Sequence, residues 1–264
     1  DITLAIPSVG ATENAILAAC GAEGTSVIYN AAREPEIVDL QALLRSMGAR
    51  VNGAGGSIIT VEGGAALHGC THRVIGDRIV CATYLCAAAA AGGEVRLTGV
   101  DYRAVSTVAL SLAESGCEVR SEADAVSLRS TGALRSVRPV RTAPYPGFPT
   151  DAQPVLMAAL LRSEGCTVFV ENIFENRYRH VDELSRMGAE IRVAGRVAVV
   201  NGVRTLHGAA VKCTDLRGGA ALVIAGLSAE GTTRVTELTH IDRGYDAIER
   251  DLAALGAQIR RETT

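Results

Sequence analysis

The sequence predicts an α/β fold built from four copies of one helix–strand–helix–strand–strand unit. Two series of glycines carry this prediction. In the first series each glycine opens an alternating, strand-like segment, and its members are Gly24, Gly93, Gly165 and Gly231. In the second series each glycine ends a helix-like stretch, and its members are Gly48, Gly116, Gly188 and Gly256. The spacings are 69, 72 and 66 residues in the first series and 68, 72 and 68 in the second. Two series with one period indicate a repeated supersecondary unit.

The first copy justifies each element of the unit. Alanine-rich residues 11–20 are typical of a helix, and residues 27–30 of a buried strand. Pro35 opens a second helix, because proline is tolerated in a first turn, and that helix carries one apolar stripe of Leu40, Leu43, Leu44 and Met47. After Gly48 ends the helix, two short strands are expected at residues 49–52 and 57–62.

Small residues crowd the first helix of each later copy, at residues 82–91, 158–159 and 218–225. Helices with small side chains can approach one another closely. We therefore expect these helices to pack together in the interior, with the sheets outside.

Composition limits the possible partners. Of 264 residues, 48% are hydrophobic and 21% charged, with a net charge of −3. A surface that binds nucleic acid or an anionic membrane would need a basic excess, and no apolar stretch approaches the roughly 20 residues of a membrane span. We expect neither a nucleic-acid nor a membrane partner. The chain starts at Asp1 with a strand-like segment, which suggests an internal position of a longer protein.

Cysteine and histidine give no metal-binding pattern. The seven cysteines are an odd number without a CxxC pair, which favours reduced, buried thiols in a cytoplasmic protein. His68 and His72 are four residues apart, but Gly69 follows His68 and the segment resembles a strand leading into a loop rather than a helix. The sequence therefore predicts no metal ion and no organic cofactor.

The segments that differ between the copies are the candidates for function. Those before the first helices start near Pro7, Ile75, Pro144 and Thr214, where free main-chain N–H groups and the positive end of the helix dipole favour an anion. The segments opening the second helices each carry an arginine with an acidic residue within two positions, namely Arg33, Arg103, Arg177 and Arg243.

Each of these features also has a purely structural explanation. Thr150 and Gln153 have the spacing of a capping box, Asp77 and Asp215 suit plain N-caps, and an isolated arginine is usually solvated or ion-paired. Their joint occurrence in a chain of low charge density nevertheless indicates a cleft that holds multiply anionic ligands.

Several motifs, in order along the whole chain, resemble one family. They are Pro7–Asn14, Ala32–Asp39, Asp77–Ile79, Pro144–Asp151, Phe174–Arg177, His180–Leu184, Thr214–Arg217 and His240–Tyr245. They look like the UDP-N-acetylglucosamine 1-carboxyvinyltransferases, a branch of the enolpyruvyl transferase family. Residues 144–151 and 174–177 resemble this branch rather than the 5-enolpyruvylshikimate-3-phosphate synthases.

The resemblance implies an inside-out α/β prism, in which two domains of three units each enclose an active-site cleft. Residues 1–74 would be the last unit of one incomplete domain, and residues 75–264 three units forming most of the second. The family's first units, its Lys-Asn pair and its loop with a reactive cysteine have no counterpart in this sequence. Val80 stands where the family often has an acidic residue. The chain thus resembles the C-terminal portion of the enzyme, expected to be inactive without the N-terminal part as its partner.

The implied reaction transfers the enolpyruvyl group of phosphoenolpyruvate to the 3-hydroxyl of UDP-N-acetylglucosamine, a step of peptidoglycan precursor synthesis in the cytoplasm. By resemblance the catalytic residues are Asp151, the base near that hydroxyl, and Asp215. The substrate-binding residues are Ser8, Val9 and Gly10 at the diphosphate, Thr150 and Ile173, and Arg177, Arg217 and Arg243 at phosphoenolpyruvate. Two alternatives stay open: a non-catalytic fragment or paralogue that only binds nucleotide-sugar, and an enolpyruvyl transferase for another acceptor.

Overall fold

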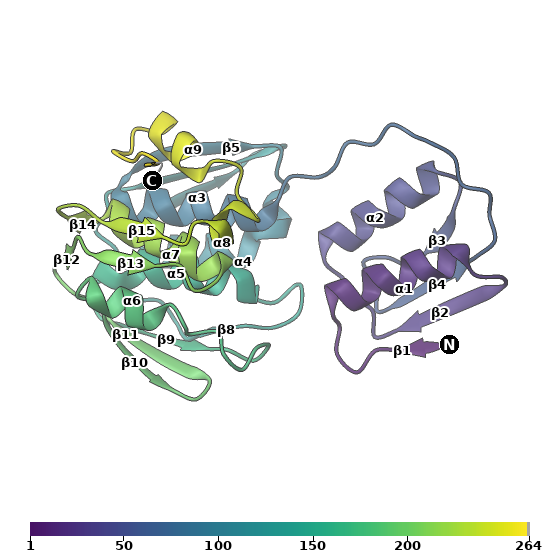
Figure 1. Cartoon of the computed structure of the whole chain (residues 1–264), viewed down its shortest axis with the longest axis horizontal. Helices are drawn as coiled ribbons and strands as arrows, with labels where there is room; N and C mark the ends of the chain where they lie inside the picture. Colours follow the sequence, from purple (N-terminus) through teal and green to yellow (C-terminus); the bar gives the residue numbers. More distant parts are fainter. Residues whose placement is uncertain (263–264) are drawn as a thin grey trace. The chain divides into compact units, whose positions relative to one another are not determined.

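A computed structural model describes residues 1–262 and divides into two compact units (Figure 1). The smaller unit comprises residues 1–76 with 144–147, and the larger one residues 77–143 and those from 148 onward. The division after Gly76 lies close to the expected boundary after residue 74. That each unit belongs to a different, three-unit domain stays a prediction.

The smaller unit is one α/β layer pair that contains every element expected for the first copy. In chain order these are β1 (Ile2–Thr3), α1 (Val9–Gly21), β2 (Thr25–Tyr29), α2 (Pro35–Ser46), β3 (Arg50–Asn52) and β4 (Ile58–Glu62). The sheet has the order β1-β2-β4-β3, with β1 parallel to β2 and the other pairs antiparallel. Its core consists of apolar residues from the sheet and both helices, including Ile16, Ile28, Ile37, Val51 and Ile59, none of which is exposed.

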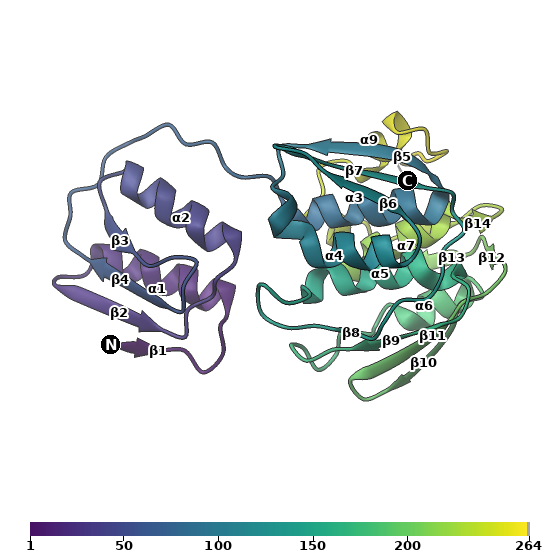
Figure 2. The ribbon, with the colours of Figure 1, turned by 180° about the vertical axis from the view of Figure 1, so that it is seen from behind.

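The larger unit is built around three helices that pack on one another, α3 (Arg78–Ala91), α5 (Gln153–Ala159) and α7 (Leu216–Leu227). Ten of the fourteen residues of α3, all seven of α5 and eight of the twelve of α7 are buried. Figures 1 and 2 show the strands arranged around these helices. The expectation of interior helices with sheets outside is confirmed for this unit.

Three groups of strands surround the central helices. The first, β5 (Gly93–Thr98), β6 (Glu118–Ser121) and β7 (Ala125–Ser130), is antiparallel in the order β5-β7-β6 and is accompanied by α4 (Tyr102–Glu114). The second has the order β10-β11-β9-β8, with β8 (Val140–Arg141) parallel to β9 (Cys166–Val170), and β10 (Glu190–Ala194) and β11 (Val197–Asn201) antiparallel. The helix α6 (Val181–Arg186) accompanies it, and the short 3-10 turn η2 (Leu160–Arg162) follows α5.

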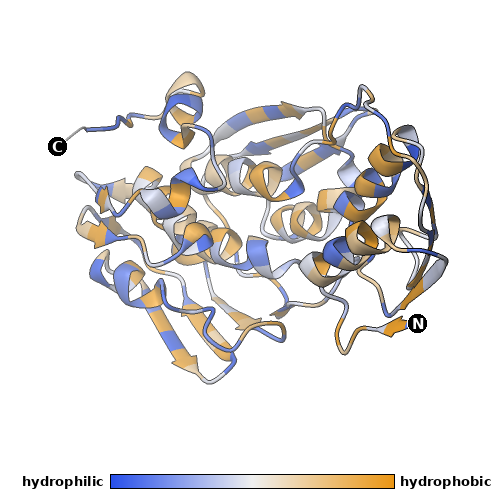
Figure 3. Cartoon of the chain, turned by 45° about the vertical axis from the view of Figure 1, so that its right-hand side comes forward, coloured by the Kyte–Doolittle hydropathy of each residue, from blue (hydrophilic) through white to orange (hydrophobic). Residues whose placement is uncertain are grey.

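The third group consists of two short parallel pairs. β12 (Leu206–His207) pairs with β14 (Ala229–Glu230), and β13 (Ala210–Lys212) with β15 (Arg234–Thr236). Several outer strands alternate between apolar and polar residues (Figure 3). In β11, for example, Ala198 and Val200 are buried while their neighbours are partly exposed, because one face of the strand packs on the interior helices.

The fourth copy departs from the expected unit. Its second-helix region forms α8 (Thr239–Asp242) and α9 (Ile248–Ala254), but residues 257–262 form no strand. The prediction of a closing strand pair after Gly256 is therefore wrong for the described residues. Arg261 instead binds Asp242 and Glu249, and the Ala257 N–H donates to the main-chain oxygen of Leu252 in α9 at 3.0 Å, so these contacts hold the segment at α8 and α9 in place of a strand pair.

The capping box expected at Thr150 is also absent. Residues Thr150–Ala152 form the 3-10 turn η1, and no side chain caps it or α5. The Thr150 hydroxyl donates instead to Glu171 Oε2 at 3.0 Å. A buried carboxylate is the stronger acceptor for this hydroxyl, and it draws the side chain away from the helix start.

Candidate functional site

A carboxylate and two arginines meet at the start of the central helices. Asp151, in η1 before α5, accepts from Arg177 Nη2 at 2.6 Å through Oδ1. Its other oxygen, Oδ2, lies 3.0 Å from Nη2 and 3.1 Å from Nε of Arg217 in the first turn of α7. Arg177 comes from the loop between β9 and α6, so three separate segments contribute to this cluster. The structure therefore brings together three residues that the sequence proposed for one site.

A chain of hydroxyl groups continues from the cluster to α3. Arg217 Nη1 donates to Tyr245 Oη at 3.3 Å, and Tyr245 Oη lies 2.8 Å from Thr83 Oγ1. Thr83 donates to the main-chain oxygen of Ile79 at 2.8 Å. Since Thr83 has one proton to give, Tyr245 donates to Thr83 and accepts from Arg217. This chain joins the starts of α3 and α7, and Arg217 also lies 5.8 Å from the centre of the Tyr245 ring.

The electrostatics of the cluster keep Asp151 ionised. Burial raises the pKa of the Asp151 carboxyl, but the positive charges of Arg217 and Arg177 outweigh burial and hold the pKa below its usual range. Conversely, Asp151 overcomes the effect of burial on Arg217 and raises the pKa of that guanidinium. Both arginine side chains are largely buried, with 14% and 13% exposed, and that of Asp151 is 36% exposed. Within the cluster two guanidinium groups face one carboxylate, so donors remain that an anionic ligand could use.

Glu171 is a residue of this region that the sequence reasoning missed. It follows β9, is only 1% exposed, and accepts from the Thr150 hydroxyl. Its other oxygen accepts from the main-chain N–H groups of Ile173 and Phe174 at 2.8 and 3.0 Å. Ile173, an expected substrate-binding residue, is thus held in position by the hydrogen bond from its main-chain N–H to Glu171. The only signal in the sequence was an acidic residue directly after an apolar strand.

Asp215 acts as an N-cap. Its Oδ1 accepts from the main-chain N–H groups of Arg217 and Gly218 at 3.0 and 2.8 Å, which confirms the structural alternative for this residue. The cap fixes the first turn of α7 and so places Arg217. A catalytic role of Asp215 stays a prediction.

His180 lies fully buried beside this helix start. A Cβ atom added to Gly218 would lie 2.9 Å from Cβ of His180 and 2.8 Å from Asp215 Oδ2, so the glycine permits a close approach of the three residues. Neither ring nitrogen of His180 has a hydrogen-bond partner among the described residues. Burial lowers the pKa of His180 to about 4, although the negative charge of Asp215 opposes this shift.

Arg243 lies outside the cluster, in a neighbouring cavity of about 600 Å³. Asp77 and Arg261 also line this cavity, as does Tyr245, which contacts Arg217 as well. The sequence assigned Arg243 to the same phosphoenolpyruvate pocket as Arg177 and Arg217. In the structure it lies near these arginines but lines a separate cavity.

The acidic residues that lie within two positions of the second-helix arginines do not all form ion pairs with them. Arg103 and Asp101 do form an ion pair at 2.7 Å, on an exposed surface. Arg177 pairs with Asp151 rather than with Glu175, which binds Arg196 at 3.1 Å.

The remaining predicted substrate residues lie in the smaller unit, at the start of α1. Ser8 is the N-cap, and its hydroxyl accepts from the main-chain N–H of Ala11 at 3.3 Å. Val9 opens the helix, and a Cβ atom added to Gly10 would meet open space. Backbone is therefore accessible at this helix start.

Histidines and cysteines form no cluster in the described part of the chain. Among residues 1–262 no group of three or more metal-ligating side chains is placed to hold an ion. His72 instead lies 2.9 Å from Asp39. Five cysteines are buried, whereas Cys70 and Cys166 are exposed. Within the same residues no helix combines the length and the apolar character that crossing a membrane requires.

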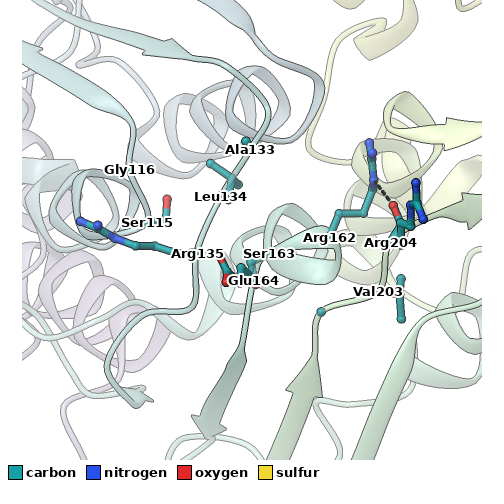
Figure 4. Close-up of a pocket in the computed structure, with 11 residues that line it drawn as sticks. Ser115, Gly116, Ala133, Leu134, Arg135, Arg162, Ser163, Glu164, Val203 and Arg204 are labelled. Atoms are coloured by element: carbon teal, nitrogen blue, oxygen red, sulfur yellow. Dashed lines mark hydrogen bonds between the residues drawn. The ribbon is translucent and has the colours of Figure 1, made fainter.

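A second depression, of about 520 Å³, contains several arginines but a different arrangement (Figure 4). Arg135 donates to the main-chain oxygen of Glu114 at 2.8 Å, near the end of α4. Arg162 donates to the main-chain oxygens of Ser228, just after α7, and of Arg204. These arginines satisfy carbonyl groups at helix ends and loops, so we assign the depression no ligand.

Comparison with known proteins identifies the family. The profile of EPSP synthase (3-phosphoshikimate 1-carboxyvinyltransferase) matches residues 1–252. The UDP-N-acetylglucosamine 1-carboxyvinyltransferase of Gluconacetobacter diazotrophicus is 53% identical over 260 residues, which are 98% of this chain and 62% of that protein. UDP-N-acetylglucosamine 1-carboxyvinyltransferase 1 of Symbiobacterium thermophilum is 52% identical over 261 residues, 99% of this chain and 59% of that protein.

Solved structures agree. The enolpyruvyl transferase NikO from Streptomyces tendae has a TM-score of 0.85 at 30% identity, covering 97% of this chain and 61% of its own. The EPSP synthase from Acinetobacter baumannii, at 20% identity and a TM-score of 0.76, shows the same fold. The chain thus spans about 60% of the length of these relatives. The resemblance inferred from the motifs is confirmed, and the chain belongs to the EPSP synthase (3-phosphoshikimate 1-carboxyvinyltransferase) family.

Proposed function

We propose that this chain forms the C-terminal part of an enzyme that transfers the enolpyruvyl group of phosphoenolpyruvate to the 3-hydroxyl of UDP-N-acetylglucosamine. The observation that carries the proposal is the meeting of Arg177 and Arg217 at the ionised carboxylate of Asp151. Relatives at 53% and 52% identity bear the name of this activity. The reaction belongs to peptidoglycan precursor synthesis, for which we propose a cytoplasmic location.

The chemistry needs groups of the kind found in the cluster. The hydroxyl oxygen of the sugar forms a bond to C2 of phosphoenolpyruvate, the bond from C2 to the phosphate oxygen breaks, and inorganic phosphate leaves. Asp151 takes up the hydroxyl proton as general base. Arg177, Arg217 and Arg243 bind the phosphate and carboxylate groups, because guanidinium groups hold such oxygens through paired hydrogen bonds.

The ion pairs of Asp151 suggest how its basicity is controlled. Without substrate, Arg217 and Arg177 hold the pKa of Asp151 low against the effect of burial, which makes it a weak base. Phosphoenolpyruvate brings negative charges that compete for the same guanidinium groups. Each pair that Asp151 gives up to the substrate raises its pKa and improves it as an acceptor for the hydroxyl proton.

The other expected residues complete the proposal. Ser8, Val9 and Gly10 would contact the diphosphate of the nucleotide-sugar, where α1 offers main-chain N–H groups. Thr150 and Ile173 would line the substrate site, and Asp215 would act beside Arg217. The N-terminal part of the same enzyme, corresponding to the portion of the relatives that this chain does not span, would supply the remaining residues.

Two other functions are compatible with parts of these observations. An enolpyruvyl transferase for another acceptor is favoured by the match of residues 1–252 to EPSP synthase, whose name gives 3-phosphoshikimate as the acceptor. A non-catalytic protein that binds only nucleotide-sugar is favoured by the limited coverage of the relatives, 62% and 59%.

Isothermal titration of the chain with UDP-N-acetylglucosamine and with phosphoenolpyruvate, beside a phosphate-release assay, tests the proposal. Binding of both ligands supports it. Binding of the nucleotide-sugar alone indicates the non-catalytic alternative. Binding of phosphoenolpyruvate without the nucleotide-sugar indicates another acceptor.

A further inference from the structure

We infer that Glu171 is a positioning residue, which holds Thr150 and the loop after β9 so that Asp151 and Arg177 meet. The placement of the two side chains follows from contacts within the larger unit. Only its consequence for substrate binding rests on the proposed function.

Glu171 anchors two segments at once. Its Oε2 accepts from Thr150 Oγ1 at 3.0 Å, next to Asp151 in the chain. Its Oε1 accepts from the main-chain N–H groups of Ile173 and Phe174 at 2.8 and 3.0 Å. One carboxylate thus fixes the turn that carries Asp151 and the loop that leads to Arg177.

The two anchored segments are also joined to each other. Arg177 Nη2 donates both to Asp151 Oδ1 at 2.6 Å and to the main-chain oxygen of Thr150 at 3.1 Å. Phe174, whose N–H binds Glu171, also packs its ring 5.6 Å from the Arg177 guanidinium carbon. Glu171, Thr150, Arg177 and Phe174 therefore form a closed ring of contacts beside Asp151.

The burial of Glu171 makes this arrangement specific. The residue is 1% exposed, and its three donors are neutral groups rather than a cationic side chain. A buried carboxylate is costly unless it is hydrogen-bonded, so the three donors must keep their positions to offset the burial of Glu171. Burial, together with the negative charge of Glu171, raises the pKa of the nearby Tyr178 hydroxyl to about 12.

Three variants of the chain separate positioning from general stability. Glu171→Ala removes both anchors. Glu171→Gln keeps an oxygen for the two main-chain N–H groups and offers an N–H to the Thr150 hydroxyl, so it should restore the arrangement. The matched control is Glu183→Ala, since Glu183 is also a largely buried carboxylate, 13% exposed, and accepts from the main-chain N–H of Lys212 at 2.9 Å.

The first measurement needs no activity. Carbon-13 NMR titration of the Asp151 carboxyl should show its pKa raised in Glu171→Ala relative to the wild-type chain, because Arg177 is no longer held against it. Amide exchange of Ile173 and Phe174 should become roughly 10- to 100-fold faster. Glu171→Gln should show neither change, and Glu183→Ala should accelerate exchange at Lys212 only. Unchanged titration of Asp151 in Glu171→Ala, or equal changes in both alanine variants, would overturn the inference.

Two additions keep the test decisive. If Glu171→Ala does not fold, Thr150→Val removes one anchor alone, and it should still raise the pKa of Asp151. An unchanged pKa in that folded variant would also overturn the inference. Titration with phosphoenolpyruvate then separates the two proposals: a wild-type chain that does not bind it counts against the proposed function, whereas the NMR result decides on Glu171 by itself.

Discussion

Asp151 and Arg217 lie 66 residues apart in sequence, close to one repeat, and their side chains meet at 3.0 Å. Asp151 precedes α5 and Arg217 lies in the first turn of α7, so they occupy related places in successive copies of the unit. Because the central helices pack on one another, residues at their starts converge. The repetition of the unit thus assembles the cluster from segments that are distant in sequence.

Replacing Asp151 by asparagine should separate catalysis from folding. We expect Asp151→Asn in an active enzyme containing this chain to lower turnover by roughly 10²–10⁴-fold, the usual effect of a positioned general base. The amide is of similar size and still offers an oxygen to one arginine, so nucleotide-sugar binding should persist. Steady-state kinetics with calorimetric binding of UDP-N-acetylglucosamine measures both.

The structure also offers a purely structural role for the Asp151 carboxylate, which the same variant tests. Asp151 also holds Arg177 and Arg217 in place. Unchanged turnover with a lower melting temperature would mean that its carboxylate serves only to pair the two arginines.

The arginines should differ in their importance for phosphoenolpyruvate. A hydrogen bond to a charged group contributes about 1.5–3 kcal/mol, which corresponds to roughly 10- to 100-fold in affinity. We therefore expect Arg177→Ala, Arg217→Ala and Arg243→Ala each to raise the phosphoenolpyruvate requirement by about this factor. The measurement is the KM for phosphoenolpyruvate in the active enzyme.

Arg103→Ala is the matched control for the arginines. Arg103 also opens the second helix of its copy, but its side chain is 85% exposed and pairs with Asp101. Four equal and small effects would show that all these arginines are structural. A large effect for Arg177 and Arg217 without one for Arg243 would restrict the site to the cluster around Asp151.

The sequence predicted the repeated unit, the interior helices and the convergence of Asp151, Arg177 and Arg217, because glycine spacing and the family motifs are local signals. It did not predict Glu171, since an acidic residue after a strand gives no sign of burial. The structural alternative for Thr150, a capping box with Gln153, is wrong, because the spacing cannot show the competing acceptor, Glu171, that the fold places just after β9.

The chain by itself should not catalyse the reaction. It matches about 60% of the length of its relatives, and none of its cysteines lies in a motif like the family's reactive-cysteine loop. We expect no phosphate release above background from phosphoenolpyruvate and UDP-N-acetylglucosamine. Release at a normal turnover would show that residues 1–264 contain a complete catalytic set.

His180 should make the larger unit less stable in mild acid. Its pKa in the folded chain is lowered from 6.5 to about 4, chiefly by burial. Between these values the unfolded chain binds a proton that the folded chain does not, so stability falls as the pH drops from about 6.5 to about 4. The full effect is about 3 kcal/mol, since one pKa unit corresponds to about 1.4 kcal/mol.

Calorimetric melting at pH 7 and pH 5 measures this effect. The loss of melting temperature on acidification should be smaller in His180→Leu than in the wild-type chain, because the buried titrating group is gone. His207→Leu is the control, since His207 is exposed, and it should behave as the wild type. Equal losses in all three proteins would mean that other groups determine the acid sensitivity.

The smaller unit should be the less stable part of the chain. A single repeat normally buries its apolar surface against neighbouring repeats. In α1 only four of thirteen residues are buried, and Leu17 is 51% exposed, whereas the corresponding helices α3, α5 and α7 are largely buried. We therefore expect amide exchange to be faster in residues 11–62 than in residues 156–225, as measured by mass spectrometry in native buffer.

Equal protection of the two segments would contradict this prediction and would mean that contacts beyond its own core, such as pairing of two chains, stabilise the smaller unit. Dilution of the chain separates these cases, because protection that depends on pairing is lost as the concentration falls.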